Sequence, residues 1–142
     1  MNPDSLDRFI VAQENTYSEA LAEIRQYRKD GHWMWFIFPQ LKGLGTSETA
    51  EYYGITDLAE AKAYLKHDIL GSRLREITEA LLCSDIECLN EIFSYVDELK
   101  LFSCMTLFHQ ADPSEDLFMQ VLKRFYHGEQ DANTLHMLDV EV

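Results

Sequence analysis

The sequence predicts an all-α fold, a multihelical single compact domain. Three observations predict it: apolar residues recur at helical spacing along most of the chain, capping residues precede these stretches, and only one short segment has strand propensity. Of the 142 residues, 46% are apolar, which is enough to build a hydrophobic core. No repeat, linker or low-complexity tract divides the chain, so we expect residues 1–142 to form one domain.

The individual helices follow from apolar spacing and from the residues at their ends. We predict helices at 6–12, 17–30, 47–53, 57–65, 70–81, 84–93, 97–108 and 115–127, with one more turn at 131–138. The expected capping residues are Asp4-Ser5, Thr46-Ser47, Asp57, Ser84 and Asp97, with Glu60 and Glu87 completing capping boxes. Gly31 and Gly128 are expected to end the helices that precede them.

The segment His32–Gln40 differs from the rest of the chain. Its four aromatic residues within six positions favour a buried strand by propensity alone. A lone strand would have no pairing partner in an otherwise helical chain, so burial is the firmer prediction. We expect this segment to pack against the helix at 97–108, because both are too apolar to stand in solvent.

The charge balance limits the partners that the protein can have. The chain has 12 Lys and Arg against 25 Asp and Glu, a formal net charge of −13. Its only basic cluster, at 25–29, falls at the end of a predicted helix, where cations favour the helix dipole. We therefore expect no nucleic acid and no membrane as partners.

The cysteines and the absence of sorting signals indicate a cytoplasmic protein. Cys83, Cys88 and Cys104 are odd in number and lack C-x-x-C spacing, which is typical of free, buried thiols. No signal peptide or apolar run of transmembrane length is present. The histidines show no metal-ligand spacing and no nucleophile motif occurs, so we expect no metal site, and the sequence leaves cofactors and enzymatic activity open.

The first candidate binding segment surrounds the aromatic residues. Trp33 and Trp35 offer stacking faces for a ligand, and His32 and Gln40 flank them. The loop that follows places Lys42, Gly43, Gly45 and Ser47 just before a predicted helix N-terminus, an arrangement that suits an anion. The alternative is a core segment followed by a loop with a good N-cap.

The second candidate is the apolar helix predicted at 97–108. Asp97, Lys100, Ser103 and Thr106 recur at every third position along it. They can bind a ligand, or Asp97 and Lys100 can pair with each other. In the structural alternative, Asp97 caps the helix, Lys100 extends to solvent, and the hydroxyls bond back to helix carbonyls.

Several segments resemble a known family: Leu6-Asp7-Arg8-Phe9, Ala12-Gln13, His32–Gln40, Gly43-Leu44-Gly45, Ala63-Tyr64-Leu65, Leu70–Leu74, Asp97–Leu101 and Met105–Phe108. This is the domain-of-unknown-function 1810 family of short, mainly bacterial proteins, sometimes mislabelled calpastatin. The resemblance implies a multihelical single domain and no established activity. The calpastatin label does not indicate protease inhibition, because calpain inhibitors of that name are disordered and this composition is that of a folded protein.

Two functional hypotheses remain. In the first, a small anionic or nucleotide-like ligand binds in a pocket between the 32–47 segment and the 97–108 helix. In the second, the aromatic residues at 33–38 dock a protein partner or a second copy of the chain. The sequence leaves the oligomeric state open. A concave pocket with convergent polar groups favours the first hypothesis, and a flat apolar patch favours the second.

Overall fold

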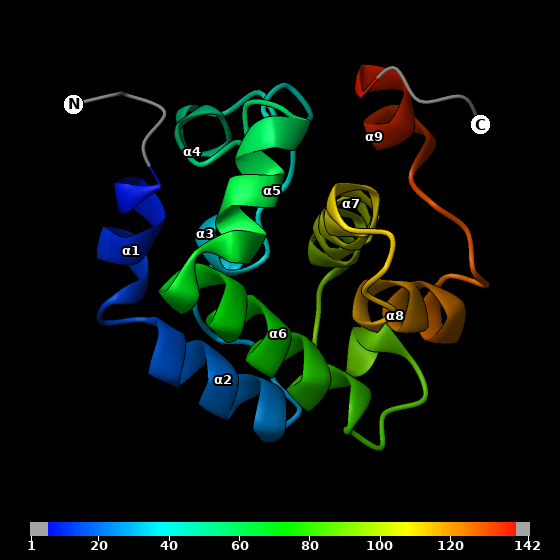
Figure 1. Ribbon diagram of the computed structural model, residues 1–142. Coiled ribbons are helices and arrows are strands. Elements are labelled where there is room, and N and C mark those ends of the chain that lie inside the picture. Colours follow the sequence, from blue (N-terminus) through cyan, green and yellow to red (C-terminus); the bar gives the residue numbers. More distant parts are fainter. Residues whose placement is uncertain (1–5, 139–142) are drawn as a thin grey trace.

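The computed structural model describes residues 6–138, which form nine α-helices and one 3₁₀ turn, with no β-sheet in that range (Figure 1). The elements are α1 (Asp7–Gln13), α2 (Tyr17–Arg25), α3 (Met34–Ile37), α4 (Glu48–Tyr52), α5 (Leu58–Lys66), α6 (Asp68–Leu82), η1 (Leu89–Glu91), α7 (Tyr95–Ala111), α8 (Leu117–Phe125) and α9 (Ala132–Met137). The all-α class is confirmed. The expected cap at Asp4-Ser5 lies outside the described residues, and the domain limits at 1–142 stay a prediction.

The longest helix, α7, is the centre of the packing. It lies between α5 and α8 in Figure 1 and also contacts α3 and α9. Most of its side chains from Leu101 to Ala111 are buried, because neighbours surround that part of the helix. The predicted start at Asp97 is wrong. The helix begins at Tyr95, because the Ser94 hydroxyl caps it by accepting the Asp97 N–H at 3.2 Å.

The helices α5 and α6 form a second packing unit, with α2 beside α6 (Figure 1). The predicted cap of α5 is confirmed, because the Asp57 carboxylate accepts the Glu60 N–H at 2.9 Å. Glu60 in turn accepts the Thr56 N–H. His67 caps α6, since its Nδ1 accepts the first free N–H groups of that helix. Sequence reasoning had assigned His67 no such role.

The strand that propensity alone favoured within His32–Gln40 does not form. Residues 34–37 form the short helix α3, and the only β-type pairing among residues 6–138 is a single bridge between Leu41 and Ile55. The prediction that the segment is buried is confirmed, because Trp33, Met34, Ile37 and Phe38 are at most 2% exposed. The expected packing on the 97–108 helix is also confirmed, since α3 contacts α7.

The predicted end of the second helix is also wrong. Helix α2 ends at Arg25, and Tyr27 takes the left-handed conformation (φ 59°) that was expected of Gly31. The Arg28 N–H donates back to the Glu23 carbonyl and closes the turn. Gly31 instead lies against the Trp33 ring, where a Cβ would come within 2.7 Å.

The capping box predicted at Ser84 and Glu87 does not form. The Ser84 hydroxyl donates to the Leu81 carbonyl at 2.6 Å, so it ends α6 and does not begin a new helix. Between 84 and 93 only the turn η1 is helical. Its Glu91 carboxylate accepts the backbone N–H groups of Glu87 and Cys88.

All three cysteines lie in the described region and are free thiols. Cys104 is buried, as expected, and burial raises the pKa of its thiol. Cys83 and Cys88 are exposed, which corrects the expectation that all three are buried. We therefore predict that two thiols react with a disulfide reagent in the native protein and the third only after unfolding. Three reactive thiols in the native state, or a loss of stability on adding dithiothreitol, would contradict this assignment.

Candidate functional site

Two adjoining cavities lie where the 40–45 loop meets α7, and Gln40 and Lys100 line both of them. The larger has a volume of about 300 Å³, and we call it the α7 cleft. Its lining residues are Gln40, Leu44, Gly45, Val96, Leu99, Lys100, Phe102, Ser103, Asp131 and Asn133. The smaller lies against Trp35, Phe38 and Tyr53 and is a crevice too narrow to hold a water molecule.

Backbone contacts fix the 40–45 loop at the edge of the cleft. The Ile55 N–H donates to the Gln40 carbonyl at 2.9 Å, and the Lys42 N–H donates to the Ile55 carbonyl at 2.8 Å. Gly45 packs so tightly on Ala50 that an added Cβ would lie 2.6 Å from the alanine Cβ. The loop is therefore held against α4 and the chain before α5, and Gln40 and Gly45 reach the cleft.

Lys100 is the cation of the α7 cleft. Its Nζ lies 4.1 Å from the centre of the Trp35 ring and 3.8 Å from Oδ1 of Asp97. No hydrogen bond among residues 6–138 uses its ammonium group. Burial lowers the pKa of Lys100, the Asp97 carboxylate opposes this change, and the Lys29 ammonium adds to it. An anion entering the cleft would therefore find a partly desolvated cation with free N–H donors.

Asp97 makes its closest ion pair with Lys29, which does not line the cleft. Its Oδ2 lies 3.0 Å from Nζ of Lys29, and the two side chains are only 14% and 9% exposed. The Lys29 ammonium also donates to the Gly31 carbonyl and lies 5.1 Å from the centre of the Trp33 ring. This pair ties the chain after α2 to the first turn of α7, and Asp97 does not line the α7 cleft.

The hydroxyls of Ser103 and Thr106 connect α7 to the start of α9. The Ser103 hydroxyl lies 2.8 Å from Oδ2 of Asp131, and the Thr106 hydroxyl accepts the Asp131 N–H at 2.9 Å. Both hydroxyls also lie within hydrogen-bond distance of helix carbonyls, Ser103 of Leu99 at 3.2 Å and Thr106 of Phe102 at 2.9 Å, as the structural alternative expected. Only Ser103 of the two lines the cleft. The cleft floor is thus a hydrogen-bonded junction between α7 and α9.

The other residues proposed from sequence lie elsewhere. Trp33 is buried and its Nε1–H donates to the Glu23 carboxylate, while His32 is exposed. Ser47 caps α4 by accepting the Ala50 N–H, and Gly43 (φ 103°) packs against Met137. The structure therefore brings Trp35, Gln40, Gly45, Lys100 and Ser103 to the two adjoining cavities. Their role in binding stays a prediction.

Lys42 and Lys100 do not line the same cavity. Lys42 is exposed and lines a separate cavity of about 350 Å³ between the start of α5 and the end of α9. The expectation that both lysines contact one anion therefore has no support from the described cavities. Lys42 is therefore a useful control. It lies in the 40–45 loop at the edge of the α7 cleft, but its side chain does not line the cleft.

Sequence reasoning missed two polar residues of the cleft, Asp131 and Asn133. Both come from the start of α9, about thirty residues after Ser103 in the chain. The sequence predicted one helical turn from Asp131 onward, but gave that residue no role in a site. Its placement beside α7 depends on tertiary packing, and the spacing of neighbouring residues in the sequence does not reveal such packing.

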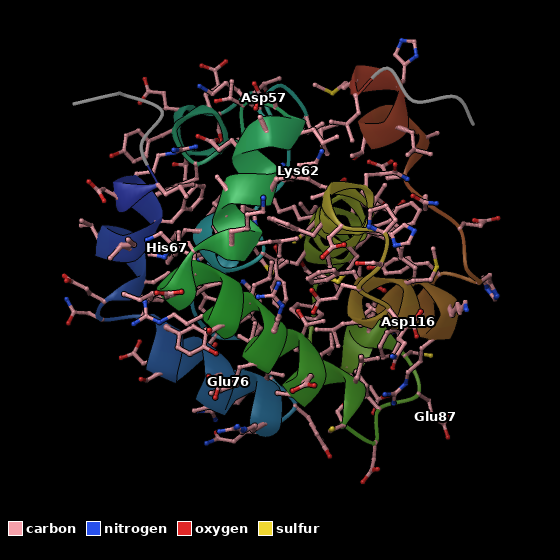
Figure 2. The ribbon with its side chains drawn as sticks, in the orientation of Figure 1. Asp57, Lys62, His67, Glu76, Glu87 and Asp116 are labelled. Atoms are coloured by element: carbon pink, nitrogen blue, oxygen red, sulfur yellow. The ribbon has the colours of Figure 1, made fainter. Side chains whose placement is uncertain are left out.

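A second polar groove among residues 6–138 carries more negative than positive charge, so it suits an anion less well than the α7 cleft. A groove of about 420 Å³ between α2 and α6 has Arg25 opposite two carboxylates, Glu76 and Glu79. The charged side chains labelled in Figure 2 are spread along the helices, with Asp57 just before α5, Lys62 on α5, Glu76 on α6 and Asp116 beside α8. Within residues 6–138, no three His, Cys, Asp or Glu side chains are grouped to hold a metal ion. No helix in that range is long and apolar enough to cross a membrane.

The chain belongs to a family of proteins of unknown function, DUF1810, whose family model matches residues 3–138. The crystal structure of the conserved hypothetical protein Rv1873 from Mycobacterium tuberculosis is similar, with 46% sequence identity and a TM-score of 0.94. The similarity covers 99% of this chain and 100% of that one. No curated protein matches the sequence. These comparisons establish the family and the fold.

Proposed function

We propose that the protein binds a small anionic molecule in the α7 cleft, with Lys100 as its charge partner. The observation that carries the proposal is the state of the Lys100 ammonium group. It lines both adjoining cavities, is mostly withdrawn from solvent, and makes no hydrogen bond within the described residues. A cation held in this way contributes strongly to binding, because a charge-assisted hydrogen bond to it is made at little further desolvation cost.

Two side-chain amides and an apolar wall support the proposal. The side chains of Gln40 and Asn133 line the cleft and make no hydrogen bonds to residues 6–138. Leu44, Leu99 and Phe102 supply apolar surface, and Phe102 is held by stacking on Tyr126 at 4.6 Å. A mostly apolar cavity with a few convergent polar groups is typical of small-molecule sites.

A nucleotide-like ligand would not stack on the tryptophans as the sequence suggested. Trp33 is buried, and the Lys100 ammonium lies over one face of the Trp35 ring. A base would instead contact Leu99 and Phe102, with its phosphate at Lys100. The cleft volume of about 300 Å³ is at the lower end of the range for small-molecule sites, so compounds no larger than a nucleoside monophosphate are the ones to test.

We favour the ligand over the docking alternative, because residues 33–38 present little surface. Four of the six are at most 2% exposed, so they cannot form a flat apolar patch for a partner. No other observation favours a docking role for this segment.

The test of the proposal is a pair of matched lysine variants, Lys100→Met and Lys42→Met. A panel of carboxylates, phosphorylated metabolites and nucleoside monophosphates is screened by thermal shift, and hits are titrated by calorimetry. We expect Lys100→Met to weaken binding by about ten- to hundredfold, because a charged contact contributes roughly 1.5–3 kcal/mol. Methionine keeps the apolar stem, so the free energy of unfolding should change by less than about 1 kcal/mol.

The Lys42→Met variant should bind as the parent does. Equal losses in the two variants would show that the ligand does not depend on the α7 cleft, and unchanged binding in Lys100→Met would exclude Lys100 as the charge partner. A Lys100→Met protein that fails to fold would assign Lys100 to the structural ion-pair network with Asp97 and Lys29.

A further inference from the structure

Asp131 brings a negative charge to the same cleft as Lys100. Its Oδ2 is fully engaged, because it accepts from the Ser103 hydroxyl at 2.8 Å and from the Thr134 hydroxyl and N–H at 2.6 and 3.3 Å. Its Oδ1 has no hydrogen-bond partner among residues 6–138, although the side chain lines the cleft. A carboxylate oxygen that is held in place but accepts no hydrogen bond within the protein can accept one from a ligand.

The cleft is therefore not a general anion site. It contains one cation, Lys100, and one anion, Asp131, so its formal charge is zero. A ligand with several negative charges would meet the Asp131 carboxylate and the field of a chain with net charge −13. A ligand with one negative and one positive group would satisfy both side chains.

The apolar wall adds a requirement for the rest of the ligand. Val96 and Leu99 line the cleft but are 58% and 46% exposed, and the partly buried Leu44 and Phe102 also line it. Both belong to the first turns of α7, where Tyr95 is also exposed, and they present aliphatic surface that an apolar group could cover. Their position beside the two opposite charges favours a small ligand over a separate docking site.

We propose that the α7 cleft binds a zwitterion of the amino-acid type with an apolar side chain, an inference that rests on the proposed function. The ligand carboxylate contacts Lys100, its ammonium group donates to Oδ1 of Asp131, and its side chain covers Val96 and Leu99. The amides of Gln40 and Asn133 complete the polar contacts.

The test compares each compound with versions of itself that lack one charge. L-phenylalanine, L-leucine and L-methionine are titrated beside their deaminated acids and their decarboxylated amines, with adenosine monophosphate as the multiply charged reference. We expect at least one amino acid to bind tenfold or more tightly than its acid and its amine, because only the amino acid uses both charged side chains. If no amino acid binds more tightly than its own acid, the inference is wrong.

The variant Asp131→Asn tests the same claim on the protein. Asparagine is a good N-cap and its amide oxygen can keep the bonds to Ser103 and Thr134, while its NH₂ group replaces Oδ1 in the cleft. The tenfold preference for the amino acid over its acid should disappear, and binding of the acid should persist. Asp116→Asn, which removes an exposed carboxylate beside α8 (Figure 2), is the matched control and should keep the preference.

The outcomes separate this inference from the proposed function. Acids that bind in a Lys100-dependent way, with no gain from the amino group, overturn the zwitterion and leave the anion site standing. If no acid, amino acid or nucleotide loses affinity in Lys100→Met, both proposals fail. Should Asp131→Asn not fold, the comparison of amino acid with acid on the parent protein still decides the inference.

Discussion

Replacing Arg8 with methionine should lower the free energy of unfolding by about 3–5 kcal/mol, because it breaks a buried ion pair by removing one partner. Arg8 and Glu60 lie 2.9 Å apart, and their side chains are only 6% and 8% exposed. The guanidinium also donates to the carbonyls of Tyr52 and Gly54 at 2.9 Å each. The variant would leave a buried carboxylate without its cation and would release α1 from the chain between α4 and α5. Urea denaturation followed by circular dichroism measures the loss.

The double variant Arg8→Met, Glu60→Gln is the control for this result. Glutamine removes the uncompensated charge but can still accept the Thr56 N–H that Glu60 holds. We expect the double variant to recover part of the lost stability, since the cost comes largely from the unpaired charge. A single variant that loses less than about 1 kcal/mol would show that the pair does not hold these elements together.

Replacing Gly71 with alanine should destabilise the protein by about 2–4 kcal/mol, which is opposite in sign to the usual effect of this change in a helix. Gly71 lies near the start of α6, and a Cβ there would come within 2.1 Å of the Leu65 carbonyl oxygen and 2.9 Å of the Arg75 guanidinium. That carbonyl accepts a hydrogen bond from Arg75 at 3.1 Å. The turn between α5 and α6 would have to open, so the packing of both helices would change.

The variant Ser72→Ala separates this clash from helix propensity. Ser72 is the next residue of the same helix and is exposed, so alanine there should be neutral or stabilising by up to about 0.5 kcal/mol. Thermal unfolding of both variants should therefore give shifts of opposite sign or very unequal size. A Gly71→Ala protein as stable as the parent would mean that the α5–α6 turn is looser than its geometry indicates.

Most of the fold could be predicted from local patterns. The helices α4 and α5 begin where Ser47 and Asp57 were expected to cap them, because side-chain capping needs only neighbouring residues. The segment at 33–38 could not be assigned correctly, since aromatic residues favour strands when no partner is considered. Its conformation follows from packing on α7 and from the ends of α1 and α4, which no local pattern contains.

The candidate site was predictable only in part, for the same reason. Lys100 and Ser103 share a helix side by their spacing, and Gln40 could be placed beside them once the aromatic segment was expected to pack on that helix. Asp131 could not be placed there, because it reaches the cleft through hydroxyl contacts between α7 and α9. Lys42 has suitable chemistry, but the bridge at Leu41 directs the chain so that it lines another cavity.

The measurement that tests the central claim most directly is a nuclear magnetic resonance titration of the ¹⁵N-labelled protein with the tightest-binding compound of the panel. A ligand bound in the α7 cleft should cause saturable chemical-shift changes centred on residues 40–45, 96–103 and 131–133. These changes should be lost in Lys100→Met at the same ligand concentration. Shifts centred on the groove at 25–27 and 76–84, or identical shifts in parent and variant, would contradict a site built around Lys100.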